Sequence, residues 1–278
     1  MKKNFLRAAA CIACSMLMVS SLAACGCLPN EVNSEKAAIS PDYEKSLQNE
    51  LFKYDIFNDH AVITSYIGSE TTVEVPEMID DKPVTELATS AFTDSSNTVK
   101  KVKIPKTVTN INKSCFSGNK IEEFEIDSDN TEYIVESGAI MDSSKTKLIA
   151  YAAACSADEF TIPNTVTSVP SGVFSQCPNL KKINIPSSVK SIDTFAFVGS
   201  GLTEVILPEG VESIGMGAFW NCKSLEILEL PKSLTNITSP ETICQSCTAL
   251  KTVKGYDSTE AQKITEGEDV NAEYVSLG

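Results

Sequence analysis

The sequence has 278 residues, which is enough for one large domain or two small ones. It is acidic, with 37 Asp and Glu against 23 Lys and Arg and a formal net charge of -14. Nucleic acids and anionic membrane surfaces bind proteins through basic patches, so this charge argues against both as the main partner.

The first 24 residues have the pattern of a secretory signal peptide. A positive start, with Lys2, Lys3 and Arg7, precedes an apolar stretch of secretory length at 8–19. The segment LAACG then resembles the lipobox of bacterial lipoproteins, in which the cysteine becomes the lipid-modified N-terminus. The resemblance implies cleavage before Cys25 and a lipid anchor on this residue. An ordinary signal peptide cut at an Ala-x-Ala site and an uncleaved membrane anchor are the alternatives.

Residues 25–50 are polar, contain two prolines and show no apolar period. This composition predicts a flexible tether between the lipidated cysteine and the folded part, which then spans 51–278. A short helix over 43–51 is compatible with the pattern. Two apolar runs at 54–68, separated by Asn58 and Asp59, predict a hairpin, and we expect the region 54–75 to cap the first open end of the fold.

A repeated apolar-proline step organises the rest of the chain. The last four steps end at Pro163, Pro186, Pro208 and Pro231, with spacings of 23, 22 and 23 residues. After a proline, apolar residues recur at positions +3 and +6 and a phenylalanine at +11. Before it stand segments such as LKKINIP, LTEVILP and LEILELP, whose period-2 pattern predicts a short strand closed by the proline.

The unit IPxxVxxIxxxAFxxCxxLxxIxI resembles the BspA-type leucine-rich repeat of bacterial surface proteins, and the resemblance covers roughly residues 54–278. It implies a strand-rich α/β leucine-rich-repeat solenoid, a right-handed coil of repeats of about 22–23 residues over 76–254. One repeat buries too little apolar surface to fold alone, so the units must stack.

Two interruptions of the period mark further features. The step from Pro105 to Pro163 is 58 residues, and within it we expect an insertion near 127–158 that contains a hairpin at 138–151. After Pro231 the register slips and Cys244 takes the place of the phenylalanine. The closing segment 255–278 resembles the terminal cap of the family, which implies a short helix and a final strand.

Cysteines can act as nucleophiles, metal ligands or disulfide partners, but their positions in the repeat favour a structural role. Cys177, Cys222 and Cys247 each follow the phenylalanine or its substitute by three residues, a column that leucine-rich repeats fill with residues bonded to the backbone. We therefore interpret them as buried and inert. Cys244 and Cys247 lack the second pair that a zinc site requires. A disulfide between Cys222 and Cys247 stays open.

Other candidates for catalysis or cofactor binding are weak. His60 is the single histidine, so a catalytic triad or a histidine metal site has only this residue to use. Glu122 and Glu123 are interpreted as a solvated strand edge, and no phosphate-binding glycine loop occurs. Trp220 suits a surface anchor or a packing residue equally. The sequence predicts no enzyme, no cofactor and no metal.

The predicted strands present alternate residues outward. Lys101 and Lys103 beside Glu123 and Glu125, and Lys182 beside Glu204, are predicted to form cross-strand ion pairs. Ile206 and Ile227 do not fit this scheme, because they are apolar and adjacent on an exposed face. The predicted partner-binding face consists of Lys182, Asn184, Glu204, Ile206, Ile227 and Glu229.

The sequence thus predicts an extracytoplasmic lipoprotein, anchored to the cell membrane or surface through Cys25 only. Its solenoid is expected to be monomeric and to bind a protein or glycan partner without catalysis. The family resemblance implies host extracellular matrix as one such partner. The alternative is a structural scaffold of the cell envelope that has no host ligand. Because a fold does not name its ligand, the partner stays open.

Overall fold

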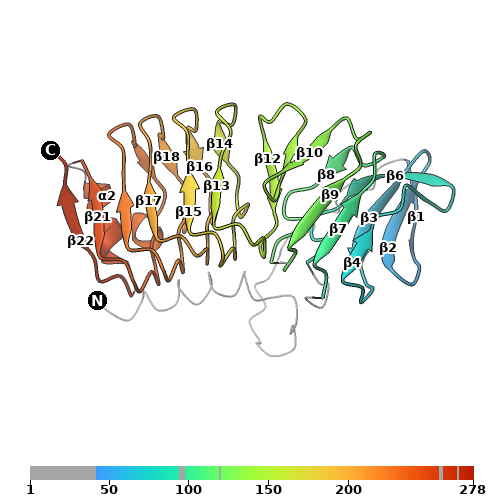
Figure 1. Ribbon diagram of the computed structural model, residues 1–278, viewed down its shortest axis with the longest axis horizontal. Helices are drawn as coiled ribbons and strands as arrows, with labels where there is room; N and C mark the ends of the chain where they lie inside the picture. The colour runs from blue at the N-terminus through green and yellow to red at the C-terminus, as the bar shows by residue number, and fades with distance from the viewer. Residues whose placement is uncertain (1–41, 94–97, 119, 257–258, 268) are drawn as a thin grey trace, which may run out of the picture. The chain divides into compact units, whose positions relative to one another are not determined.

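The structure, a computed structural model, describes residues 42–278 except 94–97, 119, 257–258 and 268. Residues 44–278 form one unit in which consecutive turns of chain lie side by side (Figure 1). The predicted signal peptide, Cys25 and the tether as far as residue 41 lie outside the described residues.

The unit begins with a sheet that contains the predicted hairpin. Strands β2 (Phe52–Phe57) and β3 (Ala61–Tyr66) pair antiparallel, and β3 pairs parallel with β6 (Lys82–Leu87). Strand β1 (Tyr43–Gln48) lies at the edge, where the sequence is compatible with a helix. Its half-buried Tyr43 and Leu47 are four residues apart, as on a helix, but pairing with β2 decides the structure. The other strands of this sheet are β5 (Met78–Ile79) and β8 (Asn110–Ile111).

Each turn of the solenoid contributes a short strand to the row predicted before the prolines. These strands pair parallel in three sheets: β4 (Thr72–Glu74), β7 (Lys101–Ile104) and β9 (Glu123–Ile126); β13 (Glu159–Thr161) and β15 (Lys182–Asn184); and β17 (Glu204–Ile206), β19 (Ile227–Glu229), β21 (Thr252–Gly255) and β22 (Glu273–Ser276).

A second row of two-residue strands follows the prolines, where the sequence shows only the apolar position at +6. It consists of β14 (Ser168–Val169), β16 (Ser191–Ile192), β18 (Ser213–Ile214) and β20 (Asn236–Ile237), all parallel. In both rows each residue pairs with the equivalent residue of the next repeat. Phe160, for example, pairs with Ile183. About nine such turns confirm the leucine-rich-repeat solenoid.

Helix makes up little of the described chain. It is confined to α2 (Thr259–Gln262) and the 3-10 turns η1 (Pro240–Thr242) and η2 (Lys263–Glu266), so the fold is richer in strand than the label α/β suggests. The segment α2, η2 and β22 lies where a short helix and a final strand are expected. No helix in the described ranges is both long and apolar enough to cross a membrane.

The repeated phenylalanines form a stack inside the solenoid. Phe174 and Phe197 have ring centroids 5.3 Å apart, and their side chains are fully buried. The stack is broken at the insertion, where β10 (Tyr133–Glu136), β11 (Ala139–Asp142) and β12 (Leu148–Tyr151) form an antiparallel sheet. There the Tyr151 ring packs against Phe174 at 5.1 Å, and the core divides into two clusters of buried residues.

Candidate partner-binding face

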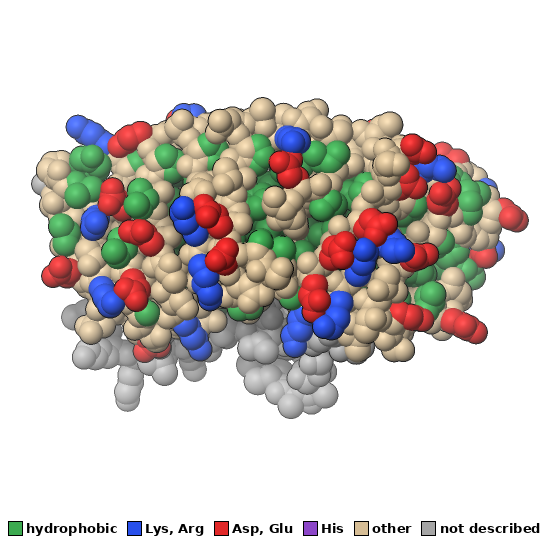
Figure 2. Space-filling view, viewed as in Figure 1, with side chains coloured by type: hydrophobic (Ala, Val, Ile, Leu, Met, Phe, Trp, Pro, Cys, Tyr) green, Lys and Arg blue, Asp and Glu red, His purple; other side chains and the backbone are tan. Residues whose placement is uncertain are grey.

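The outward residues of β13, β15, β17, β19, β21 and β22 form a polar surface over two neighbouring sheets, with a few apolar side chains at its centre. In each three-residue strand the middle residue is buried and its two neighbours face out. On β17, for example, Val205 is buried, whereas Glu204 and Ile206 are exposed. Alternation along a strand produces this division, because successive side chains point to opposite faces. Figure 2 shows acidic and basic side chains side by side on the visible face, with hydrophobic side chains among them.

Lys182 and Asn184, on β15, are held by the preceding strand. The Lys182 ammonium lies 2.9 Å from a Glu159 carboxylate oxygen, and Asn184 donates hydrogen bonds to Glu159 at 2.7 Å and Thr161 at 2.9 Å. The hydrogen bond from Lys182 lowers the pKa of Glu159. The prediction that Lys182 pairs with Glu204 is wrong, because the lysine turns towards Glu159 instead.

Glu204 and Ile206, on β17, lack such partners. Glu204 is exposed and makes no ion pair with the described residues. Ile206 has 53% of its surface exposed, a large value for an isoleucine within a sheet. On β19, Ile227 is half-buried. The Glu229 carboxylate forms an ion pair with the Lys254 ammonium, at 3.5 Å.

Ion pairs cover the corresponding surface of β4, β7 and β9. The Lys101 ammonium contacts Glu123 at 2.9 Å and Glu125 at 2.7 Å, as predicted. Lys103 instead contacts Glu74 on the preceding strand at 2.6 Å. These pairs satisfy one another on the surface, so this half of the sheet offers no comparable apolar centre.

The sheet is interrupted between β15 and β17, a break that the repeat pattern alone does not predict. The two strands are not paired, and a cavity of about 270 Å³ lies beside Ile183, Ile185 and Ile206. A signal was present in the sequence, because the step from Pro186 to Pro208 is the one spacing of 22 residues between spacings of 23.

The cysteines are packing residues. Cys177 and Cys222 are fully buried, and burial raises the pKa of the Cys177 thiol far above its usual range. The Cys222 thiol donates to the Phe197 carbonyl at 3.1 Å, and Cys247 to the Phe219 carbonyl at 3.0 Å. All six cysteines in the described part of the chain are free thiols. No cluster of metal-ligating side chains occurs among the residues described.

The two remaining candidates have local roles. His60, at the turn of the β2–β3 hairpin, stacks on Phe57 at 4.7 Å and contacts the Asp59 carboxylate at 2.6 Å. Trp220, for which the sequence left two roles, is half-buried and packs its ring against Phe195 at 5.8 Å. The Asp59 carboxylate beside His60 is exposed, and no nucleophilic side chain among the described residues is recorded in contact with either His60 or Trp220.

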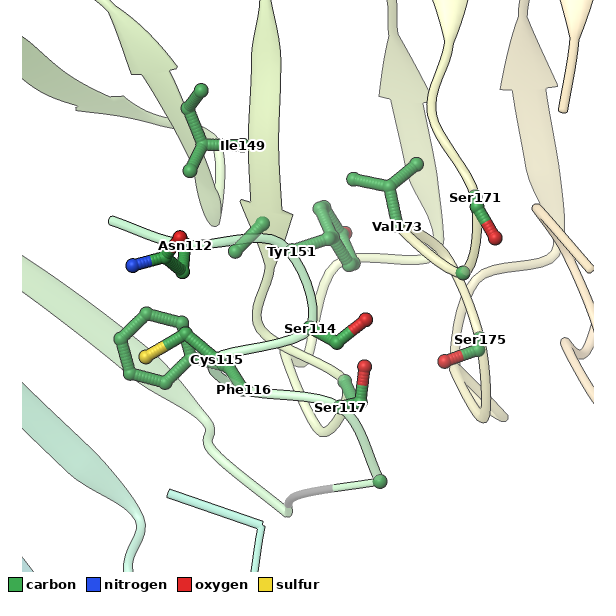
Figure 3. Close-up of a pocket in the computed structure, with 14 residues that line it drawn as sticks. Asn112, Ser114, Cys115, Phe116, Ser117, Ile149, Tyr151, Ser171, Val173 and Ser175 are labelled. Atoms are coloured by element: carbon green, nitrogen blue, oxygen red, sulfur yellow. The ribbon is translucent and has the colours of Figure 1, made fainter. Parts of the chain in front are cut away.

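A small pocket lies where the insertion meets the repeats. The hydroxyls of Ser114, Ser117 and Ser175 face a common gap between two turns (Figure 3). Tyr151 also lines it, and its buried hydroxyl has no hydrogen-bond partner within the described structure. The cavity measures about 30 Å³, which is room for one water molecule and not for a ligand.

Comparisons with known proteins agree with this architecture. The family model described as BspA type leucine rich repeat region matches residues 69–149 and 146–264, with six copies. A leucine-rich repeat protein from Eubacterium ventriosum is 24% identical, with 82% of this chain and 83% of that chain covered and a TM-score of 0.59. A leucine rich cell surface protein from Faecalibacterium prausnitzii is 20% identical, with coverages of 76% and 70% and a TM-score of 0.48. None of the curated proteins matches the chain.

Proposed function

Because the chain belongs to the BspA-type leucine-rich-repeat family, we propose that it is a non-catalytic interaction protein that binds a protein or glycan partner outside the cytoplasm. The proposed contact surface is the outward face of β15, β17 and β19, with Lys182, Asn184, Glu204, Ile206, Ile227 and Glu229. The pattern of residues 1–25 further supports a lipid anchor on Cys25.

The exposed Ile206 is the observation on which this proposal depends. Ile206 has 53% of its surface exposed, lies opposite Glu229 and is diagonal to the half-buried Ile227 on the neighbouring strand, and an exposed apolar residue among charged residues has the composition of a contact site. Burial of the exposed half of this side chain in a complex contributes on the order of 1 kcal/mol. The ion-paired half of the sheet offers no such gain.

The test is retention of defined partners by the immobilised full chain. Purified host matrix proteins and secreted glycans form one set, and proteins of the bacterial envelope form the other. Retention of the first set supports an adhesin, and retention of envelope proteins alone supports a scaffold. We expect Ile206→Lys to reduce retention at least tenfold.

Met78→Lys is the matched control, because Met78 is 52% exposed but lies on β5, in another sheet. Equal retention by wild type and Ile206→Lys would contradict the proposed surface. Turnover of a hydrolase substrate by the purified chain would contradict the non-catalytic role.

A further inference from the structure

A groove of about 380 Å³ crosses the second row of strands, in a different sheet from β15, β17 and β19. The buried Ile192 and Ile214 line it, and Gly215 stands where the turns on either side carry Asp193 and Thr238. Its polar side chains are those of Ser171, Asp193, Thr194, Ser213, Asn236 and Thr238. No Lys or Arg occurs among the described residues that line it.

The polar side chains of this groove are open to a ligand. Among the six, the Ser171 hydroxyl bonds to the protein, donating to the Thr194 carbonyl at 2.7 Å. The other five side chains have no hydrogen bond or ion pair with the described residues. By contrast, the Ser188 hydroxyl, which lies outside the groove, donates to the Val166 carbonyl at 2.8 Å. The groove therefore keeps donors and acceptors that the fold itself does not use.

Two aromatic side chains lie beside the groove. Phe195 directly follows Thr194, and its ring covers Gly217, where a Cβ would come within 2.5 Å of a ring carbon. The ring of Trp220, the single tryptophan of the sequence, lies 5.8 Å from that of Phe195, with the planes at 39°. Both side chains are half-buried, so each ring stays partly accessible from outside.

The backbone of Phe195 indicates that its ring has a role of its own. Its φ of 58° lies in the left-handed region, which is costly for an aromatic residue. The equivalent residues of the two flanking turns are Gly172, with φ 67°, and Gly217, with φ 60°. Glycine therefore satisfies this turn without strain. A bulky residue held in a strained conformation is typical of a functional position.

The groove and the two rings together match the surface of a pyranose sugar. The C–H groups on the face of such a sugar carry a small positive charge and pack against the negative face of an aromatic ring. Sugar hydroxyls both donate and accept, as the hydroxyl of Thr238 does, and they suit the amide of Asn236 and the carboxylate of Asp193. That carboxylate, in a groove without a cation among its described lining residues, disfavours an anionic sugar.

We propose that this groove and the pair Phe195–Trp220 form a binding site for a neutral glycan of β-linked, glucose-type pyranoses. In such sugars the substituents are equatorial, so the C–H face is flat and can stack on a ring. The groove volume lies within the range of about 300–1,000 Å³ that small-ligand sites occupy. This site is additional to the surface around Ile206 and does not depend on it.

The single tryptophan makes the test direct, because the tryptophan fluorescence of the full chain comes from Trp220 alone. We expect cellohexaose and its N-acetylated counterpart chitohexaose to change this fluorescence in a saturable way. Oligogalacturonate, which is anionic, should leave it unchanged. No saturable change with either neutral oligosaccharide overturns the proposal, and so does an equal response to oligogalacturonate.

Variants locate the site. Phe195→Gly removes the ring but restores the residue of the flanking turns, so we expect it to fold and to bind the neutral oligosaccharide at least about tenfold more weakly, measured by isothermal titration calorimetry. Asp193→Ala should weaken binding about three- to tenfold. Phe57→Gly is the matched control, because Phe57 is also half-buried but stacks on His60 in the β2–β3 hairpin. Equal affinity of Phe195→Gly and wild type overturns the proposal.

A peptide ligand is the competing outcome, since proline-rich segments also dock on aromatic surfaces. A saturable response to decaproline, with none to either neutral oligosaccharide, overturns the glycan assignment. Ile206→Lys should leave oligosaccharide affinity unchanged, because Ile206 lies on the other row of strands. If Ile206→Lys abolishes partner retention while no oligosaccharide binds, the proposed interaction function stands and the groove proposal fails.

Discussion

The rings of Phe197 and Phe219 lie parallel, with centroids 5.2 Å apart and planes at 4°. They are 22 residues apart in the sequence, and both are fully buried. The same relationship joins Phe174 to Phe197 at 5.3 Å. Consecutive turns are thus joined through their cores by stacked rings as well as through strand hydrogen bonds, and a ring in the middle of the stack contacts two neighbours.

Phe197→Ala should therefore lower the free energy of unfolding by about 3–5 kcal/mol, because it leaves a cavity that both neighbouring rings border. The measurement is chemical denaturation of the full chain. Phe195→Ala is the control, since Phe195 is half-buried and lies outside the stack, with its ring against that of Trp220. A loss at Phe195 as large as that at Phe197 would contradict the role of the stack.

Gly201→Ala should destabilise the protein by about 1–3 kcal/mol, because the new methyl group overlaps the Pro178 carbonyl. At Gly118 a Cβ meets nothing within 4 Å, but φ is +71°. Gly118→Ala should therefore cost only the left-handed backbone energy, about 1–2 kcal/mol. Differential scanning calorimetry compares the two variants. A Gly201→Ala variant that is more stable than the wild type would contradict the close approach of Gly201 to Pro178.

Iodoacetamide should label Cys155 first in the native protein, since it is the half-exposed cysteine among those described, whereas Cys115 and Cys177 are buried. Burial raises the pKa of both buried thiols, which lowers their thiolate content. Mass spectrometry of labelled peptides gives the order. In the denatured, unreduced protein we expect six alkylated thiols beyond Cys27, and four would indicate a disulfide such as that between Cys222 and Cys247.

Lys101→Ala should raise the pKa of Glu125 towards its ordinary value. The hydrogen bond from Lys101 lowers that pKa in the folded state, so the contribution of the pair to stability is fully present above pH 4.5. It is lost as the pH falls through the lower folded pKa. A carboxyl NMR titration measures the shift. Lys103→Ala should change it less, because Lys103 acts on Glu125 through charge alone.

Cys25→Ala should release the protein from the membrane fraction, because the proposed lipid anchor requires this thiol. Cys27→Ala is the matched control and should leave the protein with the membrane. Immunoblotting of the fractions gives the result. Retention of both variants would favour an uncleaved membrane anchor, and release of both would indicate that another feature mediates attachment.

The repeated parts of this fold can be predicted from the sequence, because the same residue pattern occurs in every repeat and each occurrence supports the others. The strand before the proline, the phenylalanine at +11 and the hairpin strands near Ala139 and Leu148 all lie where the patterns place them. The pairing of Lys101 with Glu123 also follows from register alone. Register alone does not predict which of two neighbouring strands a side chain contacts. Lys182, for example, contacts Glu159 on the preceding strand and not Glu204 on the following one.

The edge strand β1 and the gap between β15 and β17 show two further limits. Tyr43 and Leu47 have helical spacing, but β2 offers an edge for pairing, and Ser46 donates a hydrogen bond to Asp55 at 2.5 Å. Tertiary pairing outweighs a local period of this length. The gap between β15 and β17 coincides with one residue fewer between Ser200 and Leu202 than between Cys177 and Leu180 or Cys222 and Leu225, and the effect of such a deletion appears only when two turns are placed in contact.

The gap between β15 and β17 also affects how the neighbouring turns are held together. β15 and β17 are not paired, but on the other row β16 and β18 still pair, with Ser191 opposite Ser213 and Ile192 opposite Ile214. The two turns stay joined by the stacked rings of Phe174 and Phe197 and by the hydrogen bond from the Thr203 N–H to the Lys181 carbonyl. Thermal motion should still be larger across this joint than between the turns of β17 and β19, where the strands of both rows are paired.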